Sequence, residues 1–242
     1  MELREYGAMN DNVNLSSLLS ATIDEVQGNR QVILIYLAVM VVSAGIFYVL
    51  GLGVASDIFD VSSLATQSYA GLGAAVVIGV SAGLLVYFAA TYYLVAGMVR
   101  RTTAPGFDAL LPFAGIWVLS LIAIFFGFLL IIIPGIILVV RWVALLPVVI
   151  ARDAPAIDAF STSWAMSSGR GWSIFGAYVI LYMFSLVVSA IGLGFAAVGG
   201  PIVASIFDAA LTAISGVLYT ALSVGAYRLM RDDNEELTQV FE

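Results

Sequence analysis

The sequence predicts an all-α protein, a polytopic transmembrane helical bundle of about six spans with two interfacial amphipathic helices and both termini cytoplasmic. Of its 242 residues, 62% are hydrophobic and only 10% are charged, and the mean hydropathy is +1.07. A soluble domain of this size could not bury that much apolar surface, so part of it must face lipid. The other two observations are the recurrence of long apolar runs and the placement of the arginines between them.

The apolar runs define the expected spans, because a transmembrane helix needs about 20 mostly apolar residues. A membrane domain of residues 30–231 is expected between an N-terminal tail (1–29) and an acidic C-terminal tail (232–242). The spans are expected near residues 32–54, 70–99, 110–133, 136–150, 172–198 and 202–230.

One apolar stretch is too long for a single span. Residues 109–151 would reach about 65 Å as one helix, so Pro134-Gly135 is expected to divide the stretch into an antiparallel pair. The second member of this pair is short, so a second interpretation, in which the pair turns within the bilayer without crossing it fully, stays open.

The arginines predict the orientation and an even number of spans. All nine cations are Arg. With both termini in the cytoplasm, the eight arginines outside the spans fall on one face, as the positive-inside rule requires. An odd number of spans would divide these arginines between the two faces. The first 29 residues are polar and acidic, so the first span is expected to be retained and not cleaved as a signal peptide.

Two segments outside the spans have the pattern of helices that lie on the membrane surface. Apolar residues at helical spacing oppose polar residues before the first span, and residues 155–168 repeat the pattern before the fifth. The anchors expected near lipid phosphates are Arg30, Phe160, Trp164, Arg170 and Trp172. A second interpretation, in which the two helices cover the cytoplasmic mouth of the bundle, also stays open.

Arg141 is the cation expected inside a span, where an arginine costs about 2.5–3.5 kcal/mol and faces a partner or water. Arg141 follows Gly135 by six residues, and Asp208 follows Ile202 by six. Both are therefore expected at a similar depth, about 9 Å below the outer surface. We predict a buried ion pair between Arg141 and Asp208. Such a pair could fix the register of the spans or line an ion or substrate path.

Polar residues at helical spacing form a stripe on each of the last two spans. They are Asp208, Thr212, Gly216 and Thr220 on the sixth span, and Tyr178, Tyr182, Ser185 and Ser189 on the fifth. The stripes could line a water-filled or amphiphile-binding cavity. They could equally form interhelical hydrogen bonds worth about 0.6 kcal/mol each.

The second span has small residues at every fourth position. They are Gly71, Ala75, Gly79 and Gly83. Small residues at this spacing permit close helix contact. The contact could lie within the chain or between two copies of it.

The missing residue types argue against catalysis and cofactors. The sequence contains no His, Cys or Lys, so thiolate and imidazole ligands and Schiff-base lysines are absent. We expect no enzyme, no cofactor and no metal site. A carboxylate-based intramembrane hydrolase would need two acids within the spans, and only Asp208 lies in one. The net charge of −7 lies mostly at the two ends, including Asp24 and Glu25, and is expected to be solvated; nucleic acid binding would need a basic face.

The stretch PGIILVVRWVALLPVVIARDAPAIDAFSTSWAMSSGRGWSIFG carries a resemblance to a known family. It is similar to bacterial glycerophosphoryl diester phosphodiesterase membrane domains and the related YciC-type proteins. The matching residues are Pro134, Gly135, Arg141, Pro147, Ala159, Phe160, Ser163, Trp164, Gly169, Arg170 and Trp172. The resemblance implies six helices and a bacterial cytoplasmic (inner) membrane. It does not imply phosphodiesterase activity, which in that family belongs to a separate hydrolase domain not found in this sequence.

Two functions follow from these expectations. The first is a non-enzymatic accessory or scaffold protein, whose partners are membrane lipids, another membrane protein or a second copy of itself. The second is a transporter or channel for a small or amphiphilic solute, with Arg141 and Asp208 in a polar cavity. A water-filled vestibule around Arg141 would favour transport, whereas a sealed Arg141 would favour the scaffold.

Overall fold

The computed structural model of the chain describes residues 13–50, 74–130, 132–152 and 155–241. Within these ranges every regular element is a helix, and six stretches are long and apolar enough to cross a membrane. The predicted all-α bundle with about six membrane-spanning stretches is therefore confirmed, and the chain is an integral, multi-pass membrane protein.

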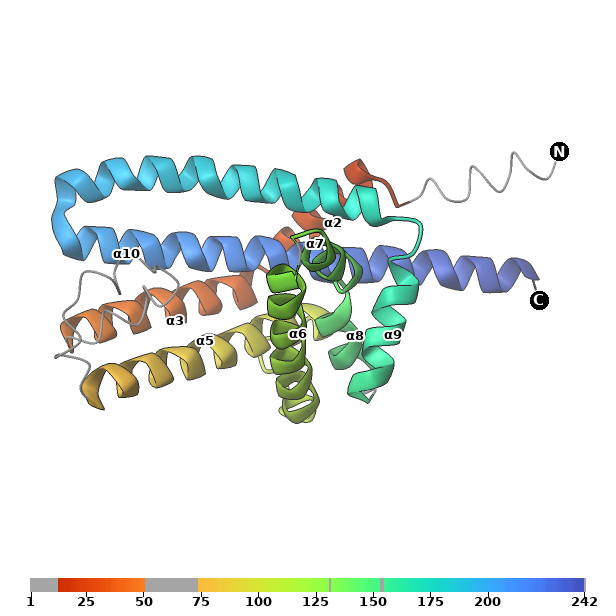
Figure 1. Cartoon of the computed structure of the whole chain (residues 1–242), viewed down its shortest axis with the longest axis horizontal. Coiled ribbons are helices and arrows are strands. Elements are labelled where there is room, and N and C mark those ends of the chain that lie inside the picture. Colours follow the sequence, from red (N-terminus) through yellow and green to blue (C-terminus); the bar gives the residue numbers. More distant parts are fainter. Residues whose placement is uncertain (1–12, 51–73, 131, 153–154, 242) are drawn as a thin grey trace. The chain divides into compact units, whose positions relative to one another are not determined.

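Figure 1 labels the described helices along the chain. Their bounds are α2 Leu15–Gly28, α3 Arg30–Val49, α5 Ala74–Arg100, α6 Leu110–Leu130, α7 Ile132–Arg141, α8 Leu145–Arg152, α9 Ala156–Met166 and α10 Gly171–Phe241. The chain divides into two compact units. The first contains Met1–Val32, Val95–Tyr182 and Leu218–Glu242, and the second contains Ile33–Leu94 and Met183–Val217.

Helix α10 folds back on itself, so that it provides two antiparallel spans (Figure 1). The ring of Tyr178 stacks on Tyr219 with centroids 5.9 Å apart, and the hydroxyls of Ser185 and Ser215 lie 3.2 Å apart. A Cβ on Gly192 would lie 2.2 Å from the Phe207 ring. The bend therefore lies between residues 192 and 207, a range that contains the expected loop at 199–201.

Helices α6 and α7 form a close antiparallel pair. A Cβ on Gly127 would lie 3.1 Å from the Cα of Gly135, and a Cβ on Gly135 would lie 2.6 Å from the Phe128 ring. Glycine is therefore required where these two helices meet. The turn comes earlier than expected, because α7 begins at Ile132. Pro134 is accommodated in the first turn of α7, where its missing N–H has no intrahelical acceptor.

The expected span 136–150 is interrupted after Arg141, where α7 ends and α8 begins at Leu145. Pro147 explains the interruption: a proline ring clashes with the carbonyl four residues earlier and cannot donate to it. That carbonyl belongs to Val143, and it accepts a 2.5 Å hydrogen bond from the hydroxyl of Ser223 on α10 instead. Helix α7 alone is about 15 Å long, half the hydrocarbon thickness.

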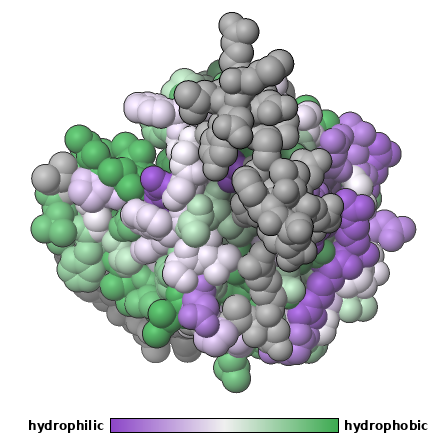
Figure 2. Space-filling view, turned by 90° about the vertical axis from the view of Figure 1, so that its right-hand side faces the viewer, coloured by the Kyte–Doolittle hydropathy of each residue, from purple (hydrophilic) through white to green (hydrophobic). Residues whose placement is uncertain are grey.

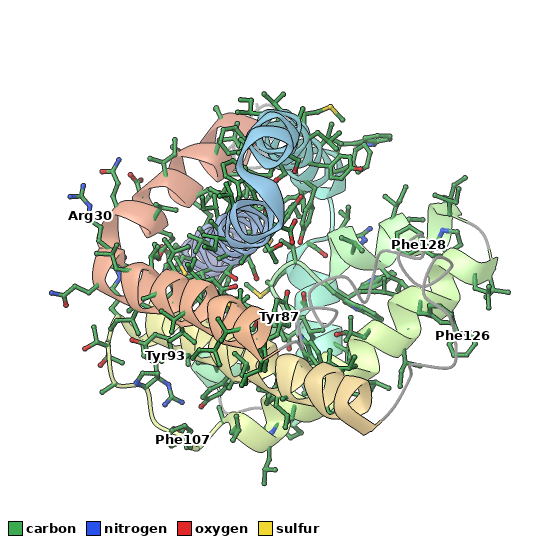
Figure 3. The ribbon with its side chains drawn as sticks, turned by 90° about the vertical axis from the view of Figure 1, so that its left-hand side faces the viewer. Arg30, Tyr87, Tyr93, Phe107, Phe126 and Phe128 are labelled. Carbon is green, nitrogen blue, oxygen red and sulfur yellow. The ribbon has the colours of Figure 1, made fainter. Side chains whose placement is uncertain are left out.

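Many large apolar side chains remain exposed on the described helices. On α6 and α7 they include Phe125, Phe126, Leu129, Leu130, Ile132 and Ile133. Figure 2 shows hydrophobic side chains over one side of the viewed face and hydrophilic side chains along the other. Figure 3 shows Phe126 at the outer side of α6. Such a surface is unfavourable in water and suits contact with lipid chains.

Candidate functional site

A buried carboxylate on α2 forms ion pairs with two arginines from other parts of the chain. Glu25 is 5% exposed, and its Oε1 lies 2.8 Å from Nη1 of Arg228 and 3.7 Å from Nη2 of Arg101. Its other oxygen, Oε2, accepts a 3.0 Å hydrogen bond from the side-chain amide of Asn29. The two arginines and the amide donor therefore offset the cost of removing the Glu25 carboxylate from water.

Arg228 also closes the end of another helix. Its Nη2 donates to the carbonyl of Met98 at 2.9 Å and to that of Val99 at 3.4 Å. These carbonyls belong to the last turn of α5, which has no intrahelical donors for them. A guanidinium at this position also interacts favourably with the helix dipole. One side chain of α10 therefore ties α2 to the end of α5.

The end of α5 is shaped to meet this cluster. The N–H of Thr102 donates to the carbonyl of Gly97 at 3.1 Å, the bond expected of a Schellman turn. Arg101 occupies the left-handed position of that turn with φ of 50°, which is unfavourable for a residue other than glycine. Its side chain reaches Glu25 from there. Glycine at position 97 is required, because a Cβ would lie 2.7 Å from Cγ1 of Val32.

The sequence interpretation of Glu25 as a solvated tail charge is therefore wrong. The buried face of α2 includes Leu18, Thr22 and Glu25, with Asn29 beyond its end, whereas Ile23 is exposed. Thr22, Glu25 and Asn29 follow one another at helical spacing. This spacing is the sequence signal that could have identified Glu25 as buried. A helix does form before the first span, over Leu15–Gly28. Asn14 caps it by accepting from the N–H of Ser17 at 2.9 Å.

A second cluster joins α9 to the end of α7. The carbonyl of Arg141 accepts hydrogen bonds from the hydroxyls of Ser163 and Ser167, each at 3.0 Å. Both serines are fully buried. At a helix end this carbonyl lacks an intrahelical donor, so the two serines of α9 satisfy it. The serines thereby fix α9 against α7.

The guanidinium of Arg141 lies over the outer side of this junction. Its Cζ is 5.2 Å from the centre of the Trp164 ring, and its Nη1 donates to the hydroxyl of Ser168 at 3.1 Å. The side chain is half-buried. Arg141 is thus at the end of α7 and against α9, inside the apolar stretch Ile132–Ala151 that is long enough to cross a membrane. The expected depth of Arg141 and the expected cytoplasmic position of α9 cannot both hold, because the two are in contact.

The predicted pairing of Arg141 with Asp208 stays a prediction. Arg141 belongs to the first compact unit and Asp208 to the second. Asp208 is exposed, as is Thr212 one turn further on.

The other expected surface anchors divide into exposed and buried residues. Figure 3 shows Arg30 pointing away from the helices at the start of α3. Trp172 is 86% exposed, and Trp164 is 42% exposed. Phe160 is half-buried against Trp142, with ring centroids 4.8 Å apart.

Arg170 does not fit the role of an anchor. It is buried, and its Nη1 donates to the carbonyl of Met166 at 2.9 Å. The guanidinium beside the exposed tryptophan of α9 is that of Arg141. The buried Arg170 follows Gly169, whose φ of 80° turns the chain from α9 into α10.

The polar stripe of the fifth span meets the returning half of α10. Tyr178 and Ser185 contact Tyr219 and Ser215, while Tyr182 is exposed. The contact between Ser185 and Ser215 is an interhelical hydrogen bond, as the simpler interpretation of the stripes expected.

The remaining residues of the sixth-span stripe and the small residues of the second span differ in their burial. A Cβ on Gly216 would lie 2.6 Å from the hydroxyl of Tyr36, so Gly216 allows α3 to approach α10. Thr220 is half-buried. In the second span Gly79 is buried and Gly83 is half-buried. Ala75 lies in α5, and Gly71 lies outside the described residues.

An exposed ion pair closes the loop between α5 and α6. Nη1 of Arg100 donates to Oδ1 of Asp108 at 2.6 Å, and Nη2 contacts Oδ2. Hydrogen bonding from Arg100 holds the pKa of Asp108 below its usual range. The pair connects the last residue of α5 to the start of α6 and is exposed to solvent.

A comparison with protein-family models, curated proteins and solved structures finds no match to this chain. The resemblance to phosphodiesterase membrane domains and YciC-type proteins therefore stays an expectation from the sequence.

Proposed function

We propose that this integral membrane protein is a non-enzymatic accessory protein that binds lipid or another membrane protein through the surface of α9. The resemblance supports a bacterial cytoplasmic membrane as its location, and the arginine pattern supports a cytoplasmic position for this surface.

The observation that carries this proposal is the exposure of α9. Its inner face is fixed by the serine bonds to the end of α7. Its outer face presents Ile157, 79% exposed, and Trp164 two turns later on the same side. A helix that is fixed on one side and exposes large apolar side chains on the other is suited to insert into a membrane interface or to receive a partner helix.

A transporter would require Arg141 and Asp208 to line one cavity. The described contacts of the Arg141 side chain are with Trp164 and Ser168 of the α9 segment. These contacts support a surface role for Arg141 more than a role in a solute path. The accessory function is therefore the better supported of the two.

Purification in polymer-bounded particles of native membrane tests the proposal. Mass spectrometry of the particles should identify an enriched phospholipid or a stoichiometric protein. Ile157→Asp should reduce that enrichment, because it places a charge on the apolar side of α9. Ser20→Asp adds the same charge at an exposed polar position of another helix, α2, and should leave the enrichment unchanged. Solute flux in proteoliposomes without any enriched lipid or protein would overturn the proposal in favour of transport.

A further inference from the structure

We propose that Arg141, Trp164 and Ser168 form a binding site for the phosphate group of a membrane phospholipid. This inference rests on the proposed function and names the ligand of the α9 surface. Arg141 is the last residue of α7, Trp164 lies in α9, and Ser168 follows the end of α9.

The position of Arg141 is fixed by its main chain. Two buried serine hydroxyls hold its carbonyl at 3.0 Å each. Below the guanidinium, the Trp164 ring lies 5.2 Å from Cζ, and cation–π attraction favours that orientation. The guanidinium is thus positioned before any ligand arrives, which lowers the entropic cost of binding.

The guanidinium has more donors than the protein uses. Among the described residues, its hydrogen bond is the one from Nη1 to the Ser168 hydroxyl. Ser168 in turn donates to the carbonyl of Trp164 at 3.0 Å. The remaining N–H groups of Arg141 form a fork, which matches two oxygens of a phosphate. The side chain is half-buried, so an anion can reach it.

The neighbouring side chains are those expected at the level of lipid headgroups. An exposed tryptophan prefers the boundary between hydrocarbon and water, and Trp164 shares its helix face with the exposed Ile157. With Ile157 among the acyl chains, Trp164 and Arg141 lie near the phosphates. The chain has a net charge of −7, so long-range attraction does not favour free anions. A bilayer instead supplies phosphate at high local concentration.

Native mass spectrometry of the purified full chain in detergent, titrated with phosphatidylglycerol, tests this site. We expect Arg141→Gln to weaken binding about tenfold or more, the effect of losing charge-assisted hydrogen bonds. Arg141→Lys should be intermediate, because it retains the charge without the fork. Ser168→Ala should weaken binding less than Arg141→Gln.

Arg231→Gln is the matched control. Arg231 also lies over an aromatic ring, 5.9 Å from the centre of Tyr227, but its Nε and Nη2 already bond to Asp232 at 3.3 and 3.1 Å. Its substitution should leave phosphatidylglycerol binding within about twofold of the unmutated chain. Equal losses for Arg141→Gln and Arg231→Gln would overturn the site.

Two further outcomes separate the possible failures. Glycerol phosphate or inorganic phosphate at millimolar concentration should not displace the lipid; displacement by either would show a soluble-anion site and overturn the lipid assignment. Lipid bound equally by all variants would overturn this site while leaving the accessory function intact. No lipid bound by the unmutated chain would overturn the site, and the accessory function would then depend on a protein partner.

Discussion

Replacing Glu25 with glutamine should destabilise the folded protein substantially. The substitution retains the shape of the side chain and removes the charge that faces Arg228 at 2.8 Å. Breaking a buried ion pair by neutralising one partner costs about 3–5 kcal/mol. Arg228 retains the carbonyls of Met98 and Val99, and 21% of its side chain is exposed, so we expect about 2–3 kcal/mol. This corresponds to an about 30- to 140-fold lower ratio of folded to unfolded protein.

The assay is unfolding of the detergent-solubilised protein by sodium dodecyl sulfate, followed by tryptophan fluorescence. Asp24→Asn is the matched control, because it removes the same charge one position away on an exposed side of α2. Its effect should be within about 0.5 kcal/mol of zero. Equal losses for the two variants would refute the argument, since they would show that the pairing of Glu25 contributes nothing beyond the charge of the helix.

A double-mutant cycle isolates the pair itself. Glu25→Gln combined with Arg228→Gln should destabilise less than the sum of the two single changes, because no uncompensated charge is left. The expected coupling is about 1 kcal/mol or more. Strictly additive losses would mean that Glu25 and Arg228 act independently.

Three further changes test other contacts. Alanine at both Ser163 and Ser167 should cost about 1–3 kcal/mol in thermal unfolding by leaving the carbonyl at the end of α7 unsatisfied, and either change alone should cost less than half of that. Gly97→Ala should destabilise by about 1–3 kcal/mol, since the new methyl group would lie 2.7 Å from a valine of α3, while Gly45→Ala, with open space around it, should be neutral or stabilising. The pKa of Asp108 is lowered in the folded chain, so its contribution is present above its unfolded pKa, near 3.8, and lost as the pH falls through the lower folded pKa. Asp108→Asn should therefore reduce the melting temperature at neutral pH and match the unmutated chain in strong acid; the same difference at both pH values would contradict this assignment.

Local sequence properties were sufficient to predict that the chain lies in a membrane and how its apolar stretches are spaced. Composition and long apolar runs are local properties, and they predicted six apolar stretches and a reversal near residues 199–201. The capped helix before the first span and the helix before α10 also agree with local periodicity. These features depend on residues within one or two helical turns of each other, which is why they can be read without a structure.

The contacts between polar groups, in contrast, depend on packing between helices that are distant in the sequence. Glu25 and Arg228 are far apart in the chain, and nothing near Glu25 in the sequence shows that a guanidinium will cover it. Helix α7 ends at Arg141, ahead of Pro147, and hydropathy does not register this interruption of an apolar stretch. The carbonyl of Val143, which Pro147 leaves without a donor, is satisfied by Ser223 of α10. The carbonyl of Arg141 is satisfied by two serines of α9. Packing brings such partners together across the bundle, whereas hydropathy reports only where each segment prefers to lie.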